Sequence, residues 1–145
     1  MTDPIKGSSR FPQPTEEKES FHPRDAHKNI SVLHVEDTDY IRDATKNFVE
    51  EMEWIYTGAP TGEDALAIYK PGAFDVIIMD IHLGSGINGY ETAKRIRKIN
   101  LHQLIYSCSS NLVDNSEHLF NGDIPKQGIR IALREKILEV VLKRA

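Results

Sequence analysis

The sequence predicts an α/β fold of the doubly wound type, with a five-stranded parallel sheet in the order 2-1-3-4-5 and a shortened fourth helix. Apolar runs of strand length alternate five times with segments of helical periodicity, a pattern typical of a parallel sheet covered on both faces. Two of these runs end in acidic residues, as expected where buried strands reach a ligand-binding edge. Because crossovers between parallel strands are right-handed, few other topologies remain.

The first elements are expected between residues 30 and 72. Ile30–Val35 is a short apolar run, typical of a central strand. Asp39–Met52 has the spacing of an amphipathic helix. The apolar face of that helix is formed by Ile41, Ala44, Phe48 and Met52. Trp54–Thr57 is the second strand. Thr61 is placed to cap the next helix, which Pro71-Gly72 is expected to end.

The middle of the chain continues the alternation. Phe74–Met79 is apolar apart from one acid and is the third strand. Leu83–Gly89 is a glycine-rich loop. Tyr90–Ile99 follows as a helix with its basic residues facing outward. Leu104–Ser109 is the fourth strand.

The last third is less regular. Asn111–Asn121 is polar and short, so we expect its helix to be weak or broken. Gly122–Lys126 marks the place of a fifth strand. Gly128–Lys143 is the closing helix. Its apolar stripe consists of Ile129, Leu133, Ile137, Val140 and Val141.

Residues 1–28 differ in composition from the rest of the chain. They contain four prolines, balanced charges and few aliphatic residues. Such a segment has too little apolar area to offset the entropy lost on ordering. We therefore predict a flexible N-terminal tail over residues 1–28 and one folded domain over residues 29–145.

Composition narrows the classes of function. A net charge of −4 argues against binding nucleic acid through a basic surface. A single cysteine, Cys108, excludes an internal disulfide framework and suits a reducing compartment. No apolar run approaches the roughly 20 residues that a membrane helix needs. We expect a cytoplasmic protein that binds neither nucleic acid nor a membrane.

Three acidic residues end two of the apolar runs. Glu36 and Asp37 follow the first run, and Asp80 follows the third. In the order 2-1-3-4-5 those two strands are neighbours, so the carboxylates meet at one edge of the sheet. Two unit charges about 4 Å apart repel by roughly 4 kcal/mol at an effective dielectric near 20, so the cluster needs a cation or a bound proton. Oxygen ligands favour Mg²⁺, and a carboxylate beside Mg²⁺ is a candidate phosphoryl acceptor.

Four motifs carry a more specific resemblance. Val32–Asp37, Ala59–Leu66 and Val76–Leu83 resemble the response-regulator receiver domain of two-component signalling, which has a flavodoxin-like fold. The loop Gly84–Gly89 resembles the family's turn into its third helix, with one residue more than the commonest form. Each motif is weak alone, but four in order at matching spacings are specific. The resemblance extends from Asn29 to Ala145.

The resemblance implies a role for each acid and for one lysine. Asp80 would be the phosphoacceptor. Asp37 would ligate Mg²⁺ directly, Glu36 directly or through water, and the backbone carbonyl of His82 would be a further ligand. Lys126, in Ile124-Pro125-Lys126, matches the family's lysine at the end of strand five, which neutralises charge during phosphoryl transfer.

The family also has a serine or threonine at the end of strand four, which hydrogen-bonds the bound phosphoryl group. Counting forward from Gly89 indicates Ser109. The apolar run Leu104–Tyr106 and the short distance to Lys126 indicate Ser107 instead. Ser109 is preferred, and Ser107 remains the alternative.

Three departures from the family pattern fall near the fifth strand. Gln127 stands where a proline with a cis bond is usual, so either the loop is trans with a repositioned lysine or strain is carried there. Asp123 stands where an aromatic residue is usual. The segment between strands four and five is about five residues short. All three affect the family's usual output face and leave the phosphoacceptor edge intact.

The resemblance therefore implies a phosphoacceptor that receives its phosphoryl group from a histidine kinase or a histidine phosphotransfer protein. Its catalysis would be limited to its own phosphorylation and dephosphorylation. Since no DNA-binding segment is recognised, output is expected through protein–protein contact with a downstream target. The alternative is a pseudo-receiver that keeps the fold and binds partners without phosphorylation.

Overall fold

The computed structural model describes residues 29–144, so the predicted tail over residues 1–28 and Ala145 lie outside it. Five parallel strands form one sheet in the order β2-β1-β3-β4-β5, which confirms the predicted topology. The strands are β1 (Ser31–Val35), β2 (Ile55–Ala59), β3 (Val76–Asp80), β4 (Ile105–Cys108) and β5 (Gly122–Asp123). The helices are α2 (Asp39–Glu51), α3 (Gly62–Ile68), α4 (Gly89–Ile99) and α5 (Ile129–Arg144). None of these helices is long and apolar enough to cross a membrane.

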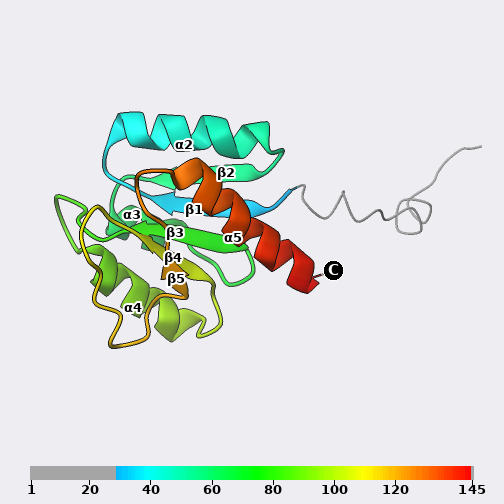
Figure 1. Cartoon of the computed structure of the whole chain (residues 1–145). Coiled ribbons are helices and arrows are strands. Elements are labelled where there is room, and N and C mark those ends of the chain that lie inside the picture. The colour runs from blue at the N-terminus through cyan, green and yellow to red at the C-terminus, as the bar shows by residue number, and fades with distance from the viewer. Residues whose placement is uncertain (1–28, 145) are drawn as a thin grey trace, which may run out of the picture.

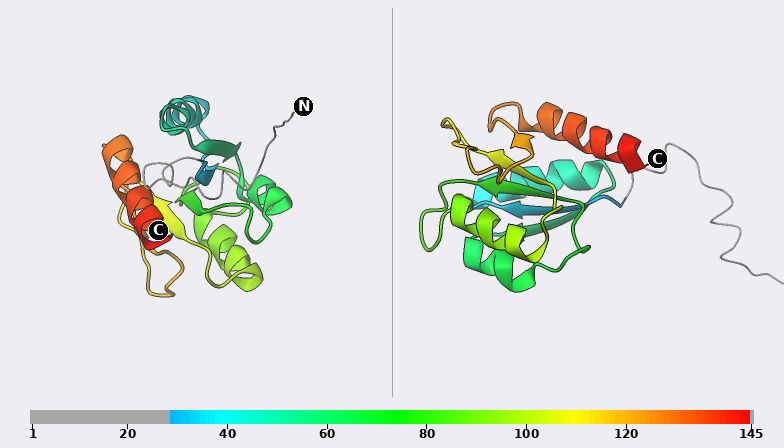
Figure 2. Two further views of the ribbon diagram at one scale, coloured as in Figure 1. Left: turned by 90° about the vertical axis from the view of Figure 1, so that its right-hand side faces the viewer. Right: turned by 90° about the horizontal axis from the view of Figure 1, so that it is seen from below.

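The helices cover both faces of the sheet. Helices α2 and α5 lie on one face, and α3 and α4 lie on the other (Figures 1 and 2). Successive residues of a strand point to opposite faces. Val32 and Ile78 accordingly belong to the core beneath α2 and α5, whereas Leu33 and Ile77 belong to the core beneath α3 and α4.

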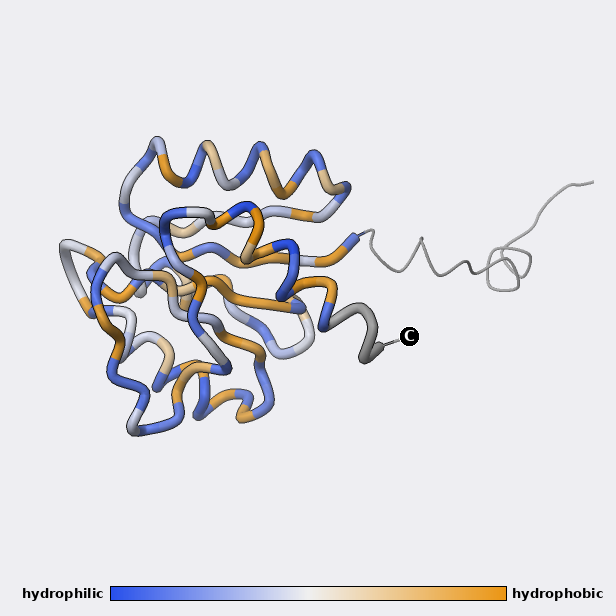
Figure 3. Tube along the Cα trace, viewed as in Figure 1, coloured by the Kyte–Doolittle hydropathy of each residue, from blue (hydrophilic) through white to orange (hydrophobic). Residues whose placement is uncertain are grey.

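Both faces of the central strands are therefore apolar. All five residues of β3 are buried, as are the last four of β1. The apolar character of the central strands is visible along the chain in Figure 3. Such runs, without polar alternation, are what a sheet buried on both faces requires. On α2 the buried residues are Thr45, Phe48 and Val49, while Ala44, expected inward, is exposed.

Local side-chain chemistry sets several helix ends. The hydroxyl of Thr61 accepts a hydrogen bond from the Asp64 amide at 3.0 Å, as the predicted cap requires. Helix α3 ends at Ile68, earlier than Pro71-Gly72, because Tyr69 turns to an extended conformation. Its buried ring packs in the core, and its hydroxyl donates to Gln103 Oε1 at 2.6 Å.

The shortened helix that was expected between β4 and β5 is absent: no helix forms in the described segment from Ser109 to Asn121. Short polar side chains bond the backbone there and compete with helical hydrogen bonds. The amide of Asn115 bonds both the N–H and the C=O of Phe120, each at 2.9 Å. Arg97 of α4 donates to the carbonyl oxygens of Leu119, Leu101 and Gln103 and to Asn121 Oδ1. The loop is thus held by side chains in place of a helix.

The fifth strand is also shorter than the predicted Gly122–Lys126. Only two residues form β5, although Ile124 N still donates to Ser107 O at 2.7 Å. Pro125 follows and has no N–H to continue the ladder. The chain then crosses to α5, where Leu133 and Ile137 are fully buried as predicted.

Candidate metal centre

Strand register brings the three predicted acids together. Val35 pairs with Met79 across β1 and β3, so the residues that follow, Glu36 and Asp80, are also neighbours. One carboxylate oxygen from each of Glu36, Asp37 and Asp80 lies within 4.8 Å of the other two. Asp80 is the last residue of β3, whereas Glu36 and Asp37 begin the turn into α2. The structure thus forms the acidic cluster that the sequence predicted at this edge.

Burial raises the free-energy cost of keeping these carboxylates charged. Glu36 is 1% exposed and Asp80 3%, while Asp37 is exposed. The second oxygen of Glu36, Oε2, accepts a hydrogen bond from the Thr38 amide at 3.2 Å. Oε1 of Glu36 is buried and accepts no hydrogen bond from the described residues. Such an oxygen carries a desolvation penalty unless a cation reaches it.

Lys126 reaches the same cluster from the chain after β5. Its Nζ lies 3.1 Å from Glu36 Oε1, outside hydrogen-bonding geometry, and 3.4 Å from Asp80 Oδ2. Burial lowers the pKa of Lys126, but contact with Glu36 and the charge of Asp80 outweigh it, so the net pKa is raised. Lys126 is therefore positioned to carry a positive charge against two buried carboxylates.

The pKa of Glu36 is shifted in the opposite sense from that of a well-paired acid. Burial and the adjacent Asp80 charge raise the pKa of Glu36, and contacts with Lys126 and Thr38 offset this only in part. Three carboxylates against one ammonium leave excess negative charge. Adjacent oxygens around one Mg²⁺ are about 3 Å apart and opposite ones about 4 Å, so oxygens within 4.8 Å of one another need only small adjustments. The donor set, all carboxylate oxygen and with more negative charge than Lys126 neutralises, fits Mg²⁺.

The backbone around Asp80 is closely packed. Gly89 begins α4, and a Cβ atom on it would overlap the carbonyl oxygen of Asp80. Only glycine allows this approach of α4 to the end of β3. The amide of His82 donates to Asp80 Oδ1 at 3.3 Å, so the turn after β3 follows the carboxylate closely. This brings the His82 backbone to the cluster.

The two candidate serines have different surroundings. Ser107 is 1% exposed, and its hydroxyl donates to Asp123 Oδ1 at 2.9 Å. Asp80 pairs with Cys108 in the sheet, so Ser109 is the first residue beyond that pair. Its hydroxyl accepts a hydrogen bond from the Asn111 amide at 3.2 Å.

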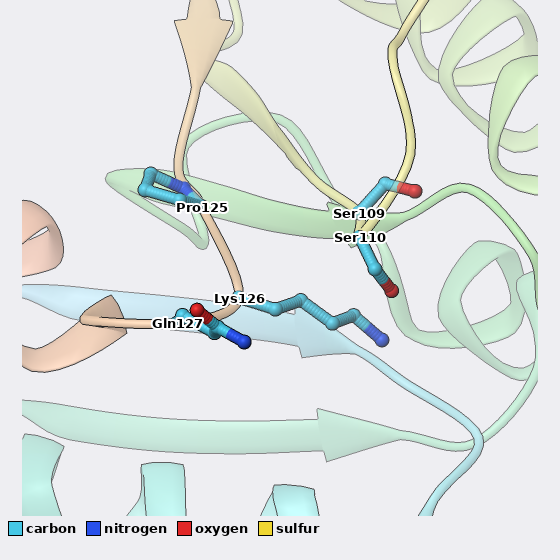
Figure 4. Close-up of a pocket in the computed structure, with 5 residues that line it drawn as sticks. All are labelled: Ser109, Ser110, Pro125, Lys126 and Gln127. Carbon is cyan, nitrogen blue, oxygen red and sulfur yellow. The ribbon is translucent and has the colours of Figure 1, made fainter.

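A hollow of about 270 Å³ lies at this edge of the sheet, lined by Ser109, Ser110, Pro125, Lys126 and Gln127. Figure 4 shows Lys126 extending from the chain after β5 toward the side where Ser109 and Ser110 lie. Ser107 does not line this hollow. Of the two serines, only Ser109 therefore shares the hollow with Lys126.

The loop that carries Gln127 in place of proline is trans. No peptide bond among residues 29–144 is cis. The loop is therefore trans, and Lys126 lies within 3.4 Å of both buried carboxylates.

Arg42 is a contributor that the sequence reasoning missed. Its Nη1 donates to the Glu36 carbonyl oxygen at 2.6 Å, and its guanidinium also contacts the Asp39 carboxylate. It therefore holds the turn between β1 and α2. The spacing of three residues from Asp39 was the available signal, but such pairs are common on exposed helix faces and the contact to Glu36 is not visible in sequence.

Comparison with known proteins places the sequence in one family. The family model for the response regulator receiver domain matches residues 32–121, more than half of the chain. Ethylene receptor 2 of Arabidopsis thaliana is 25% identical over 149 residues, covering 96% of this chain and 19% of the receptor. The aerobic respiration control sensor protein ArcB of Escherichia coli is 30% identical over 96 residues, covering 64% of this chain and 12% of ArcB. The chain thus spans less than a fifth of the length of these curated relatives.

A solved structure shares the fold at similar identity. Response regulator TrrA of Thermotoga maritima, crystallised with Mg²⁺ and BeF, is 28% identical with a TM-score of 0.68, covering 75% of this chain and 96% of TrrA. TrrA is also known in complex with histidine kinase ThkA, with the same identity, TM-score and coverage. With the family model matched over most of the fold and the sheet order confirmed, this chain belongs to the response regulator receiver domain family of two-component signalling.

Proposed function

We propose that this protein is a phosphoacceptor, with Asp80 receiving a phosphoryl group in the presence of Mg²⁺. The observation that carries the proposal is the convergence of the Glu36, Asp37 and Asp80 carboxylates within 4.8 Å, with the Lys126 ammonium against two of them. Glu36, Asp37, Asp80 and the His82 backbone carbonyl would hold the metal. Bound Mg²⁺ would offset charge on the transferring group.

The protein's own residues have defined tasks in this transfer. A carboxylate oxygen of Asp80 attacks the donor phosphorus, forming a P–O bond as the P–N bond of a phosphohistidine breaks. The imidazole leaves with the bonding electron pair and takes up a proton. Lys126 neutralises charge on the phosphoryl oxygens, and Ser109 donates a hydrogen bond to one of them. Hydrolysis restores the unphosphorylated protein. Water attacks phosphorus, the P–O bond to Asp80 breaks, and inorganic phosphate and the Asp80 carboxylate are released.

We further propose that the donor is a histidine kinase or a histidine phosphotransfer protein and that the protein acts in the cytoplasm. Its relative TrrA forms a complex with a histidine kinase, and its relative ArcB is itself a sensor protein. Output would be binding of a downstream protein. The altered surface around the 109–121 loop and the two-residue β5 suits an unusual readout.

That same surface favours one alternative, a pseudo-receiver that binds partners without phosphorylation. The 109–121 loop, which has no helix, and the short β5 lie beside the hollow that Ser109 and Lys126 line. The acidic cluster itself has no missing member, so phosphorylation remains the better-supported function.

Labelling with a small phosphodonor separates the two functions. We expect wild-type protein to incorporate one hydroxylamine-sensitive phosphoryl group with Mg²⁺ and none with a chelator. Asp80→Asn should abolish incorporation, while Asp43→Asn, on the exposed part of α2, should label normally. Equal labelling of wild type and Asp80→Asn would contradict the assignment of Asp80, and an unlabelled wild type that binds Mg²⁺ would favour the pseudo-receiver.

A further inference from the structure

An acidic residue outside the cluster bonds the glycine-rich loop between β3 and α4. Glu63 lies in the first turn of α3, and its Oε2 accepts a hydrogen bond from the Ile87 amide at 3.0 Å. The loop backbone also lies directly against this carboxylate, because a Cβ atom on Gly86 would be 2.5 Å from Glu63 Oε1. Ile87 packs over Gly62, where an added Cβ would be 2.8 Å from Ile87 Cγ1. The loop is thus seated on the start of α3.

The other end of this short loop lies against the acidic cluster of Glu36, Asp37 and Asp80. A Cβ atom on Gly84 would be 2.8 Å from Asp37 Oδ2. Gly84 and Gly86 have φ values of +77° and +73°, which permit the close approach at both ends. The three-residue segment 84–86 therefore lies against the Asp37 carboxylate at one end and the Glu63 carboxylate at the other.

The Asp37 carboxylate is held by fewer hydrogen bonds than the other two acids of the cluster. It is the exposed member of the cluster, and no residue within the described range hydrogen-bonds its carboxylate. Glu36 and Asp80, in contrast, accept hydrogen bonds from Thr38 and His82. The loop backbone at Gly84 is what limits the Asp37 carboxylate on this side.

We propose that Glu63 is a positioning residue for the metal centre, acting through the 84–87 loop on Asp37. The inference rests on the proposed Mg²⁺-dependent function. Glycines give a loop many alternative conformations, and a hydrogen bond to a charged acceptor is among the stronger ways to select one. With Glu63 in place, the loop holds Asp37 beside Glu36 and Asp80; without it, Asp37 must be ordered when the cation binds.

Three variants test the proposal on the full chain. Glu63→Ala removes the acceptor for the Ile87 amide. Glu63→Gln keeps a side-chain oxygen that can accept the same hydrogen bond. Asp64→Ala is the matched control, because Asp64 is an exposed acid in the same helical turn and has the same charge. Mg²⁺ affinity is measured by amide NMR titration without phosphodonor, together with the hydrogen-exchange rate of the Ile87 amide.

We expect Glu63→Ala to weaken Mg²⁺ affinity about three- to tenfold, less than loss of a direct ligand partner, and to speed Ile87 amide exchange about tenfold. Glu63→Gln should restore most of the affinity, and Asp64→Ala should bind Mg²⁺ as wild type does. Equal affinities for Glu63→Ala and wild type, or equal losses for Glu63→Ala and Asp64→Ala, would overturn the positioning role while leaving the proposed function intact. A wild type that binds no Mg²⁺ would instead overturn both.

Discussion

Lys126 Nζ lies 3.1 Å from Glu36 Oε1, although β5, which precedes the lysine, is separated from β1 by two other strands. The long lysine side chain spans this distance from the loop after Pro125. It brings a positive charge to a buried carboxylate whose pKa is raised by burial and by Asp80. The pair therefore links the loop after the two-residue β5 to the end of β1.

Replacing Lys126 should destabilise the metal-free protein. Lys126→Met leaves Glu36 and Asp80 buried beside each other without a compensating charge, so we expect the free energy of unfolding at pH 7 to fall by about 1–3 kcal/mol. Urea denaturation in the presence of a chelator measures this loss. Added Mg²⁺ should recover part of it, because a ligand that binds only the folded state stabilises that state.

The matched control for this change is Lys98→Met, on the exposed side of α4. It should alter the free energy of unfolding by less than about 0.5 kcal/mol. If both variants were equally stable in chelator, the contact of Lys126 with the carboxylates would have no energetic importance.

The two serines near the end of β4 should separate stability from phosphorylation. Ser107→Ala removes a buried donor to Asp123 and should lower the free energy of unfolding by about 1 kcal/mol, with little effect on labelling by a phosphodonor. Ser109→Ala should leave stability nearly unchanged and slow the labelling several-fold. Each variant is the control for the other, and slower labelling confined to Ser107→Ala would reverse the assignment.

Arg97 should be essential for the 109–121 loop, which stands where a helix was expected between β4 and β5. Its guanidinium donates to four oxygen acceptors, of Leu101, Gln103, Leu119 and Asn121, a planar fork that a lysine cannot reproduce. We expect Arg97→Lys to lower the free energy of unfolding by about 2–4 kcal/mol, measured by urea denaturation.

Arg95→Lys provides the comparison on the same helix. Arg95 pairs with Glu91 at 2.8 Å on an exposed face, so its replacement should have an effect of about 0.5 kcal/mol or less. Similar losses for the two variants would show that the 109–121 loop is held by other contacts.

His34 should make stability fall on mild acidification. Its ring is 1% exposed in β1, with Nδ1 2.8 Å from the Tyr56 hydroxyl. Burial, with the charges of Lys126 and Arg42, lowers the pKa of His34 from 6.5 to about 3. Between those values the unfolded chain binds a proton that the folded protein does not, so the stabilising contribution is complete above pH 6.5 and is lost as the pH falls toward 3.

The expected contribution to the slope is about 1.4 kcal/mol per pH unit below pH 6, measured by urea denaturation from pH 7 to pH 4. His34→Gln should reduce the slope by about that amount, whereas His102→Gln, at an exposed position, should not. Protonation of His34 in the folded protein at pH 5, seen in its ring NMR shifts, would contradict this account.

Sequence patterns were sufficient for the elements that depend on local periodicity. The apolar runs at Ile30–Val35 and Phe74–Met79 predicted two central strands, and the doubly wound fold class, with right-handed crossovers that leave few topologies, predicted their order in the sheet. The acids after those runs were expected at one edge because parallel strands end together. These features are encoded over a few consecutive residues, so one sequence suffices to find them.

The region after β4 was less predictable, for a physical reason. A polar segment such as Asn111–Asn121 has no periodic apolar face, and its conformation depends on Asn115 bonding the backbone within the segment and on Arg97 of α4 bonding it from outside. The polar composition predicted a weak or broken helix, but not that the helix would be absent altogether or that β5 would have only two residues.

By itself the sequence determined the fold class, the strand order and the acids that meet at the sheet edge, because side-chain periodicity and chain handedness act locally. Only the tertiary structure decided which serine shares the hollow with Lys126, how far Lys126 reaches, and that Glu63 is connected to Asp37 through a glycine loop. Those relationships are distances between residues far apart in the chain. They depend on strand register and on close backbone packing, which no short stretch of sequence specifies.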